Sequence, residues 1–191
     1  MINIVYGGSF NPPTKAHYEI VKKLLNEFRD SKVIIVPVGD TYFKKELIDF
    51  KIRKEMLKIV FNTNPNVEIN DIEYYKPFDG TLKTLLSLEQ VYENLHLVIG
   101  ADNLVNFDKW INYEEILKKY PLIIIKRNKQ DVNELIKKYL YLKPKYQVIE
   151  FNNEANSTAI RNNVHEHKDW LDRNVYQYIK DNELYGAWNN V

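Results

Sequence analysis

The chain lacks cysteine altogether. Disulfide frameworks, thiolate nucleophiles and metal sites with cysteine ligands are therefore excluded. The chain also has no large excess of one charge. It contains 27 Lys and Arg residues and 26 Asp and Glu residues, which gives a formal net charge of +1. A general nucleic-acid or membrane-surface binder needs an excess of positive charge, so we expect neither partner.

Long apolar runs are missing as well, since no segment approaches the roughly 18 apolar residues that a membrane span requires. The run from Met1 to Tyr6 has no basic leader and no small-residue cleavage site. It therefore indicates a first strand rather than a signal peptide. From these features we expect a cytoplasmic protein that does not associate with membranes.

The composition that is present is ordinary for a globular protein, with 191 residues of which 45% are hydrophobic and 28% charged. One domain typically occupies about 100–200 residues, and no linker or internal repeat divides this chain. We therefore expect a single domain over residues 1–191.

Short runs rich in Val and Ile alternate with longer stretches whose apolar residues recur every three or four positions. The short runs suit strands buried on both faces, and the longer stretches predict amphipathic helices. The expected strands are 2–6, 33–38, 67–70, 95–100, 122–126 and 147–151, and the expected helices are 17–28, 52–61, 82–92, 132–140 and 170–184. This alternation predicts an α/β fold, a doubly wound parallel sheet with helices on both faces and ligands at the carboxyl ends of the strands.

A loop with two glycines and two prolines, residues 7–17, follows the first strand and opens the first helix. Its glycines let the backbone approach a ligand closely, and Thr14 is placed as the N-cap of the helix. A helix start offers free N–H groups and a partial positive charge, which favour an anion. Thr14 and His17 lie on one side of the first turn, where both can face a phosphate, although a packed or capping histidine is the alternative. The spacing matches neither a G-x-G-x-x-G fingerprint nor a Walker A loop.

This loop resembles the (H/T)-x-x-H signature of the nucleotidylyltransferase superfamily, with G-S-F-N-P at 8–12 followed by Thr14 and His17. The resemblance implies a Rossmann-like fold and transfer of a nucleoside monophosphate from a triphosphate to a phosphorylated acceptor. It assigns catalytic roles to Thr14 and His17. It also assigns ATP binding to Gly8, Ser9 and Phe10. Thr14 and Ala16 depart from the first His and the Gly of the commoner H-x-G-H form.

A second element suited to phosphate is A-N-S-T-A-I-R at 155–161, after the last expected strand. Ser and Thr at a helix start offer hydroxyl and N–H groups, and Arg161 adds a charged fork that matches phosphate oxygens. A helix cap beside a solvated arginine is the alternative. The segment resembles the I-S-S-T-x-I-R element of the same superfamily, which implies that Ser157, Thr158 and Arg161 bind the β- and γ-phosphates of ATP. Ala155 and Asn156 do not match that element.

The stretch L-V-I-G-A-D-N-L at 97–104, with Trp110 downstream, resembles the I-G-A-D-x-L…W block of nicotinate and nicotinamide mononucleotide adenylyltransferases. The resemblance implies that Gly100 and Asp102 bind the adenosine of ATP and that Trp110 stacks on the pyridine ring of the acceptor. A flat indole suits that role because it offers a large stacking area and attracts a cationic pyridinium. Core packing is the alternative for Trp110, and Ile111 stands where the family often has an aromatic residue.

Two further stretches resemble the same family. Lys44 and Lys45, with Arg53 after them, resemble its basic loop, which implies that Lys44 or its neighbour reaches the triphosphate. A solvated charged loop is the alternative. Thr81 and Thr84 resemble the E…S-Y-T-x-D-T stretch that meets the nicotinate carboxylate in the family. Glu73 and Gly80 fall in the same stretch but match it less clearly, and Asp79-Gly80 suits a turn before a helix equally well.

The resemblance as a whole implies transfer of AMP from ATP to nicotinate mononucleotide, giving nicotinate adenine dinucleotide and pyrophosphate for NAD biosynthesis. ATP and a pyridine mononucleotide are the expected partners, and a homo-oligomer is possible. We expect no metal site in the protein itself and Mg²⁺ bound mainly through the ATP phosphates. His165 and His167 fall on different faces of a helix and are expected to be exposed. A phosphopantetheine adenylyltransferase, a cytidylyltransferase and a catalytically inactive nucleotide-binding regulatory protein are the alternatives.

Overall fold

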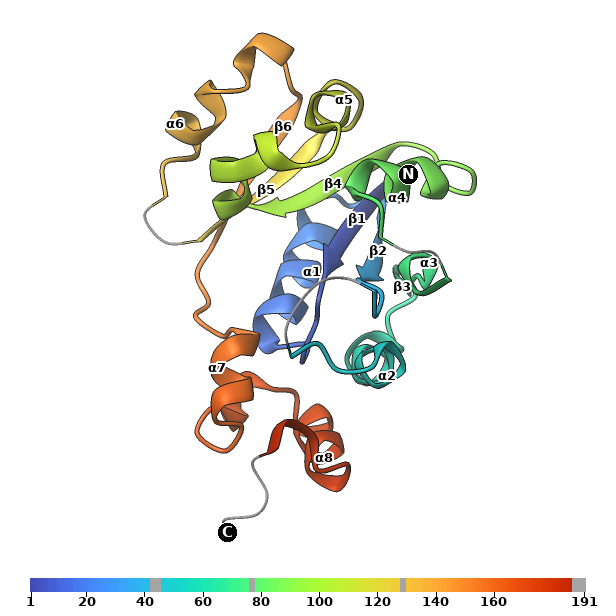
Figure 1. Cartoon of the computed structure of the whole chain (residues 1–191), viewed down its shortest axis with the longest axis vertical. Helices are drawn as coiled ribbons and strands as arrows, with labels where there is room; N and C mark the ends of the chain where they lie inside the picture. The colour runs from blue at the N-terminus through green and yellow to red at the C-terminus, as the bar shows by residue number, and fades with distance from the viewer. Residues whose placement is uncertain (42–45, 76–77, 128–129, 187–191) are drawn as a thin grey trace.

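The computed structural model describes residues 1–41, 46–75, 78–127 and 130–186. Six parallel strands within these ranges form one sheet in the order β3-β2-β1-β4-β5-β6 (Figure 1). The strands are β1 (Ile2–Gly8), β2 (Ser31–Pro37), β3 (Val67–Ile69), β4 (Leu95–Gly100), β5 (Leu122–Arg127) and β6 (Tyr146–Phe151). The parallel α/β sheet expected from the sequence is confirmed, and each run rich in Val and Ile is a strand.

The strand order reverses between β1 and β4. From β1 the chain moves outward through β2 to β3, and it then returns to the opposite side of β1 as β4. In α/β sheets such a reversal leaves a crevice beyond the carboxyl ends of the two central strands. The glycine loop follows β1 and the Gly-Ala-Asp segment follows β4, so both predicted elements border this crevice.

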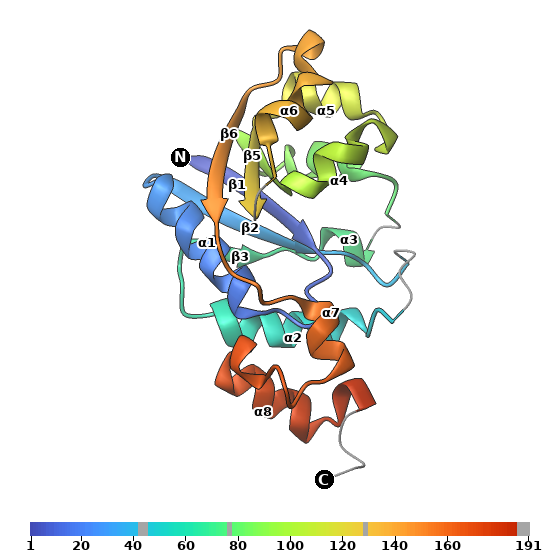
Figure 2. The ribbon, with the colours of Figure 1, turned by 90° about the vertical axis from the view of Figure 1, so that its left-hand side faces the viewer.

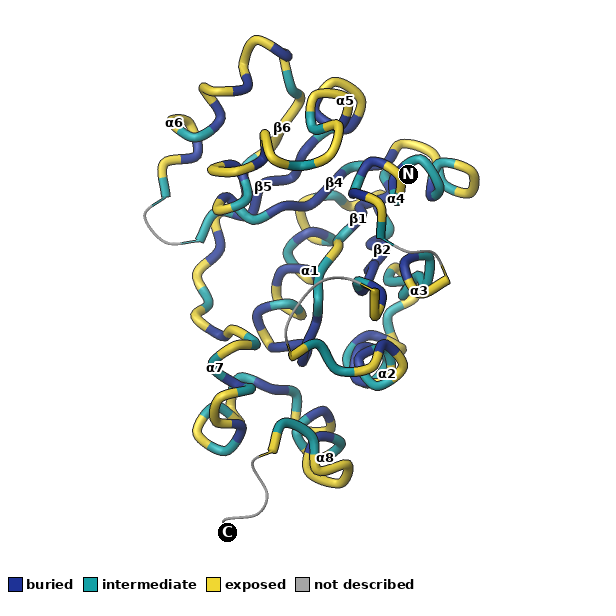
Figure 3. Tube along the Cα trace, in the orientation of Figure 1, coloured by how far each residue is buried: buried dark blue, intermediate teal, exposed yellow. Residues whose placement is uncertain are grey.

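Helices cover both faces of the sheet (Figures 1 and 2). They are α1 (Lys15–Glu27), α2 (Phe50–Phe61), α3 (Ile72–Tyr75), α4 (Thr81–Leu88), α5 (Tyr113–Lys119), α6 (Val132–Lys137), α7 (Ser157–Asn162) and α8 (Arg173–Asp181), with 3-10 segments η1 (Ala101–Lys109), η2 (Leu140–Leu142), η3 (Lys168–Trp170) and η4 (Leu184–Gly186). Val5 and Ile34 pack into the core beneath α4, α5 and α6. Their strand neighbours Ile4 and Ile35 pack beneath α1 and α2. The central strands are mostly apolar because both of their faces are covered, and they are dark blue in Figure 3.

A third core cluster holds the carboxyl-terminal helices against α2. Met56 of α2 packs with Ile160 of α7 and with Val175 and Ile179 of α8. This contact places α7 and α8 together at one end of the molecule, beside α2 and the start of α1 (Figure 2). In the ranges described above, no helix combines the length and apolarity needed to cross a bilayer.

The last helix begins at Arg173 and not at residue 170 as the sequence predicts, because Asp172 caps it with a carboxylate oxygen 2.7 Å from the backbone nitrogen of Asn174. Trp170 belongs instead to η3, where its indole stacks on the His167 ring at a centroid distance of 4.3 Å. The expectation that His165 and His167 are exposed is wrong, since both are half-buried in this region.

Candidate functional site

Two adjoining cavities lie at the crevice between β1 and β4. The large cavity has a volume of about 730 Å³ and the small cavity about 410 Å³. Tyr6, Val98 and Gly100 line both of them, so the cavities meet at the strand reversal. Both volumes are in the range of about 300–1,000 Å³ that small-molecule sites occupy.

Some of the predicted ATP-binding and acceptor-binding residues line these cavities, whereas Phe10, Thr14 and His17 line neither of them. Gly8, Ser9, Thr81, Thr84 and Trp110 line the large cavity, whereas Asp102 lines the small one. Gly100 belongs to both. The structure therefore brings together the glycine loop, the end of β4 and the start of α4, which the sequence places far apart.

Thr14 and His17 form a hydrogen-bonded unit at the first turn of α1. Thr14 is the N-cap, and its Oγ1 accepts a bond from the backbone nitrogen of His17 at 3.4 Å. In return, the backbone nitrogen of Thr14 donates to Nδ1 of His17 at 2.9 Å. The two side chains lie on one side of the turn, as their spacing predicts. Because Nδ1 accepts this bond, the neutral imidazole carries its proton on Nε2.

The surroundings of His17 keep its imidazole neutral. Burial, and then the positive charge of Arg127, lower the pKa of His17 to about 3. The ring packs edge-on against Phe10, with 5.1 Å between centroids, and lies 6.3 Å from the Tyr6 ring. Phe10 is buried and supports the histidine from within the loop. At neutral pH, His17 therefore offers a single Nε2–H donor and no charge.

The second predicted phosphate element packs directly against the glycine loop. Ser157 Oγ donates to the carbonyl oxygen of Pro12 at 2.8 Å, and Arg161 Nη1 donates to that of Asn11 at 2.8 Å. The Arg161–Asn11 bond joins positions 150 residues apart. Arg161 Nε lies 3.5 Å from a Glu46 carboxylate oxygen and is buried without a hydrogen-bond partner among the described residues. Arg161 thus braces the loop as well as carrying charge beside it.

The start of α7 is capped by Asn156. Its Oδ1 accepts a bond from the backbone nitrogen of Ala159 at 2.9 Å, so this departure from the family pattern preserves the helix start. Thr158 is exposed, and its hydroxyl oxygen accepts a 3.4 Å bond from Arg161 Nη2. Neither Ser157, Thr158 nor Arg161 lines the large or the small cavity, so the element borders the site from the glycine-loop side.

Gly100 stands at the junction of the two cavities and is tightly constrained. A Cβ atom there would lie 2.3 Å from Oδ1 of Asp102, which is far inside van der Waals contact. Asn103 Nδ2 also donates to the Gly100 carbonyl oxygen at 3.3 Å. Glycine therefore allows the Asp102 carboxylate to fold back over the strand end at the edge of the small cavity.

Trp110 and the start of α4 form one end of the large cavity. The indole stacks on Phe107, with 4.5 Å between centroids and 24° between planes, which covers one of its faces. Gly80 precedes α4 with a φ of 91°, and a Cβ built on it would lie 3.1 Å from Cβ of Ile111. Ile111 is 56% exposed at this rim and leaves the cavity mouth more open than a larger aromatic side chain would.

Thr84 is bound to a buried carboxyl group that also lines the large cavity. Its Oγ1 donates to Glu73 Oε1 at 2.9 Å, while Glu73 Oε2 has no hydrogen-bond partner among the described residues. Burial raises the pKa of Glu73 from 4.5 to about 6, and the bond from Thr84 only partly offsets this. The Thr84 hydroxyl proton is thus engaged by Glu73, whereas the Thr81 hydroxyl makes no hydrogen bond within the described part of the chain.

Replacing Glu73 with glutamine is expected to stabilise the fold at pH 7 by about 2 kcal/mol and to change stability little at pH 4, provided that Thr84 keeps its bond. The folded-state pKa is raised, so wild type carries no ionisation penalty below pH 4.5, and the penalty grows to its full size above pH 6. Urea unfolding of both proteins across this pH window measures the difference. Glu27→Gln, at an exposed position of α1, is the matched control; an equal gain at pH 4 and pH 7 would contradict the prediction.

Arg53, which the sequence places with the basic loop, is fully buried and structural. Its guanidinium donates to the carbonyl oxygens of Ile48, Ser9 and Val38 at 2.8, 3.0 and 2.8 Å. It also lies 3.2 Å from Oδ1 of Asp40. Arg53 therefore ties the glycine loop to the segment after β2. The predicted triphosphate contacts Lys44 and Lys45 lie outside the described residues.

Four further cavity residues escaped the sequence analysis. Tyr6 lines both cavities, Arg127 and Gln130 line the small one, and Lys109 lines the large one. The sequence could have indicated Arg127 and Gln130, because Arg127 directly follows the fifth predicted strand and Gln130 lies three residues further on, at the strand end where parallel sheets bind ligands. Tyr6 gave no signal, because a tyrosine at the end of an apolar strand is equally suited to core packing.

Comparison with known proteins agrees with this arrangement. A family model described as cytidylyltransferase-like matches residues 5–163. A protein of Acholeplasma laidlawii named "Probable nicotinate-nucleotide adenylyltransferase" is 38% identical over 183 residues, which cover 95% of this chain and 96% of that protein. The chain belongs to the nicotinate-nucleotide adenylyltransferase family.

Other members of this family and a solved structure extend the comparison. A Caldicellulosiruptor bescii protein of the same name is 37% identical over 143 residues, or 71% of this chain and 73% of that protein. The structure titled "Plasmodium falciparum nicotinic acid mononucleotide adenylyltransferase complexed with NaAD" superposes with a TM-score of 0.80 at 22% identity, and covers 97% of this chain and 98% of that one. At that identity the match supports the Rossmann-like fold.

Proposed function

We propose that this protein transfers AMP from ATP to nicotinate mononucleotide and releases pyrophosphate and nicotinate adenine dinucleotide. The observation that carries the proposal is the pair of cavities joined at Gly100, within reach of the glycine loop. Two mononucleotide units need two such spaces that meet where the phosphates react. The names of the relatives, at up to 38% identity among those described above, agree with this activity.

The acceptor fits the large cavity. Trp110 offers its indole for stacking on a pyridinium ring. The start of α4 points at the same space without a side-chain cap, because Gly80 occupies the N-cap position and leaves the first N–H groups free. A free helix start and the Lys109 ammonium both attract an anion, which favours the carboxylate of nicotinate over the neutral amide of nicotinamide.

The donor fits the small cavity and the glycine loop. Asp102 would accept hydrogen bonds from the ribose hydroxyls of adenosine at the edge of the small cavity. The triphosphate would extend from Gly100 along the glycine loop, where Gly8 and Ser9 bring the backbone close. Its tail would end near the start of α7, where Ser157, Thr158 and Arg161 supply hydroxyl and guanidinium donors.

The reaction would be an in-line attack of the acceptor 5′-phosphate oxygen on the α-phosphorus of ATP, with pyrophosphate as the leaving group. The nucleophile is already an anion, so the site needs no strong general base. The main barriers are bringing two anions together and stabilising charge as it shifts to the leaving group. His17 would donate its Nε2–H to the α-phosphate without itself carrying a charge, and Thr14 fixes the ring orientation that makes this possible.

Magnesium fits this site as an ion that arrives on the triphosphate. No group of three or more His, Asp or Glu side chains suited to a metal occurs in the described part of the chain. The donor set of the crevice is rich in hydroxyl, amide and cationic groups, which bind phosphate rather than a divalent cation. Mg²⁺ keeps several waters and binds readily through phosphate oxygens, where it would neutralise their charge. A cytoplasmic location, a single domain and a homo-oligomer stay predictions from the sequence.

The proposal is tested by measuring pyrophosphate release from ATP with nicotinate mononucleotide, nicotinamide mononucleotide and phosphopantetheine in parallel, and with CTP replacing ATP. We expect nicotinate mononucleotide with ATP to give the highest kcat/KM. Turnover confined to phosphopantetheine or to CTP would replace the proposal with one of the sister activities. A protein that binds ATP and turns over none of these pairs would be a regulatory nucleotide binder instead.

A further inference from the structure

The small cavity is lined by three charged or amide side chains, Asp102, Arg127 and Gln130. None of the three makes a hydrogen bond to another described residue. Side chains on a protein surface are often free in this way, but these three converge on one space of about 410 Å³. A cavity with an apolar floor and a few convergent polar groups is typical of a small-molecule site.

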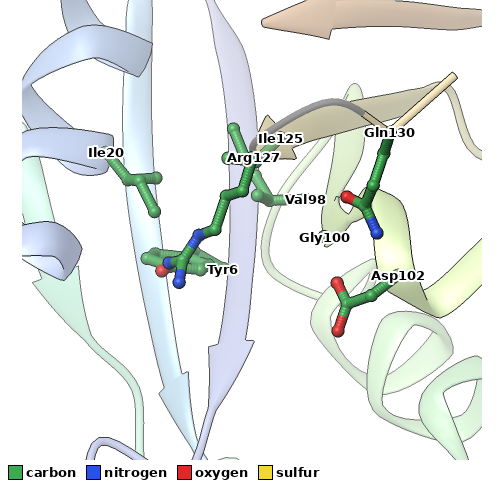
Figure 4. A pocket seen from close by; sticks show the side chains of 8 residues that line it. All are labelled: Tyr6, Ile20, Val98, Gly100, Asp102, Ile125, Arg127 and Gln130. Atoms are coloured by element: carbon green, nitrogen blue, oxygen red, sulfur yellow. The ribbon is translucent and has the colours of Figure 1, made fainter. Parts of the chain in front are cut away.

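The side chains are arranged around a slot (Figure 4). Tyr6 and Arg127 lie on one side, whereas Asp102 and Gln130 lie on the other. Ile20, Val98 and Ile125 supply the apolar part of the lining. The Arg127 guanidinium also lies over the Phe151 ring, 5.6 Å from its centre. A planar ring that enters this slot would meet flat groups on one side and hydrogen-bonding groups on the other.

We propose that Gln130 recognises the base of the nucleotide donor and makes adenine the preferred purine. The carboxamide presents one donor and one acceptor side by side. Adenine presents the complementary pair on its N6 and N7 edge, and Gln binds that edge with two hydrogen bonds. Guanine presents two acceptors, O6 and N7, at the same places and can satisfy only half of the carboxamide. This inference rests on the proposed function, because it takes the donor to be a nucleoside triphosphate.

The other polar groups that line the cavity do not explain a preference for adenine. The Tyr6 hydroxyl can both donate and accept, so it can bind either purine. Arg127 carries donors only, and an arginine at the base edge would favour guanine. Its place beside Tyr6 instead suits stacking on the face of the base. An ionised Asp102 carboxylate can accept hydrogen bonds but cannot donate them. It also lies at the strand end, where the ribose is expected. Gln130 is therefore the side chain of the small cavity whose donor and acceptor pattern distinguishes the two purines.

The test compares ATP with GTP in wild type, Gln130→Ala and Gln130→Lys. The kcat/KM for each donor is measured with nicotinate mononucleotide, and the affinity of each nucleotide for the free protein is measured by calorimetry. We expect Gln130→Ala to lower the ATP-over-GTP ratio roughly 5- to 100-fold, mainly by weakening ATP. Gln130→Lys should lower it further, because an ammonium donates to both guanine acceptors. Gln147→Ala, at an exposed position of β6, is the matched control and should leave the ratio unchanged.

Each outcome decides the inference. An ATP-over-GTP ratio that stays at the wild-type value in both Gln130 variants, or a wild type that accepts both purines equally, would overturn it. Failure of the proposed function is distinguishable, since wild type would then turn over no donor while the calorimetric affinities still report on Gln130. A loss of affinity for both nucleotides to the same extent would assign Gln130 a general packing role and would also overturn the inference.

Discussion

Replacing His17 with alanine is expected to lower the kcat for AMP transfer about 100- to 1,000-fold, which is the usual cost of removing one donor that stabilises transition-state charge. The physical reason is the Nε2–H group, which the bond from the Thr14 backbone nitrogen to Nδ1 fixes in place. Because the pKa of His17 is lowered to about 3, the donor is present throughout the neutral range. The kcat/KM profile should therefore show no inflection from His17 between pH 6 and pH 8.

Structural damage must be separated from lost chemistry in this variant. Half of the capping box at α1 disappears with the imidazole, which costs about 1 kcal/mol of stability. Urea unfolding measures that cost directly. His96→Ala is the control, because this half-buried histidine packs near Phe28 at the amino end of β4, whereas the glycine loop lies at the carboxyl ends of the strands. If His17→Ala kept more than a tenth of the wild-type kcat, the donor role would be wrong.

The largest loss of stability is expected from Arg53→Met. The side chain is fully buried, and its removal leaves three carbonyl oxygens without their guanidinium donor, whereas the Asp40 side chain is 43% exposed and can turn to water. A hydrogen bond to a charged group contributes about 1.5–3 kcal/mol, so the loss of these three bonds is expected to cost about 3–5 kcal/mol. The Ser9 carbonyl is one of these partners, so ATP affinity should fall together with the free energy of unfolding. Urea unfolding and ATP titration on the same samples check both effects.

Two further variants test whether the loss of stability comes from the contacts of the Arg53 guanidinium. Arg29→Met removes an arginine at an exposed position and should change stability by less than about 0.5 kcal/mol. Arg53→Lys retains the charge but offers a single nitrogen in place of the planar fork, so it should fall between wild type and the methionine variant. A loss below about 1 kcal/mol in Arg53→Met would mean that water replaces the guanidinium at these carbonyls.

Much of the fold could be predicted from local pattern. The runs of Val and Ile predicted all six strands because both sheet faces are covered, and Thr14 was identified as the N-cap that it is. Strand order could not be derived in the same way, since it depends on which strands pair. The start of the last helix was misplaced because the apolar Trp170 suits a helical face, whereas the capping carboxylate of Asp172 decides the boundary.

In the candidate site as well, residues in local motifs could be identified from the sequence, whereas roles that depend on contacts between distant residues could not. Residues that lie in a compact motif, such as Thr14, His17, Gly100 and Asp102, could be singled out as candidates from the sequence. The roles that depend on three-dimensional contact were not, because nothing local indicates that Arg53 is buried or that Gln130 shares a cavity with Asp102. The tautomer of His17 likewise follows from one backbone hydrogen bond, which only the folded turn creates.

The bond between Arg161 and Asn11 also bears on how the enzyme is made in the cell. The ribosome synthesises a chain from its amino end. The glycine loop, with Asn11, therefore emerges about 150 residues before Arg161. Throughout that interval a nascent chain can pair β1 with β2 yet has nothing to brace Asn11 from the α7 side. Affinity for ATP should therefore arise late in translation, and stalled chains that end before Ser157 should not compete with finished enzyme for the nucleotide.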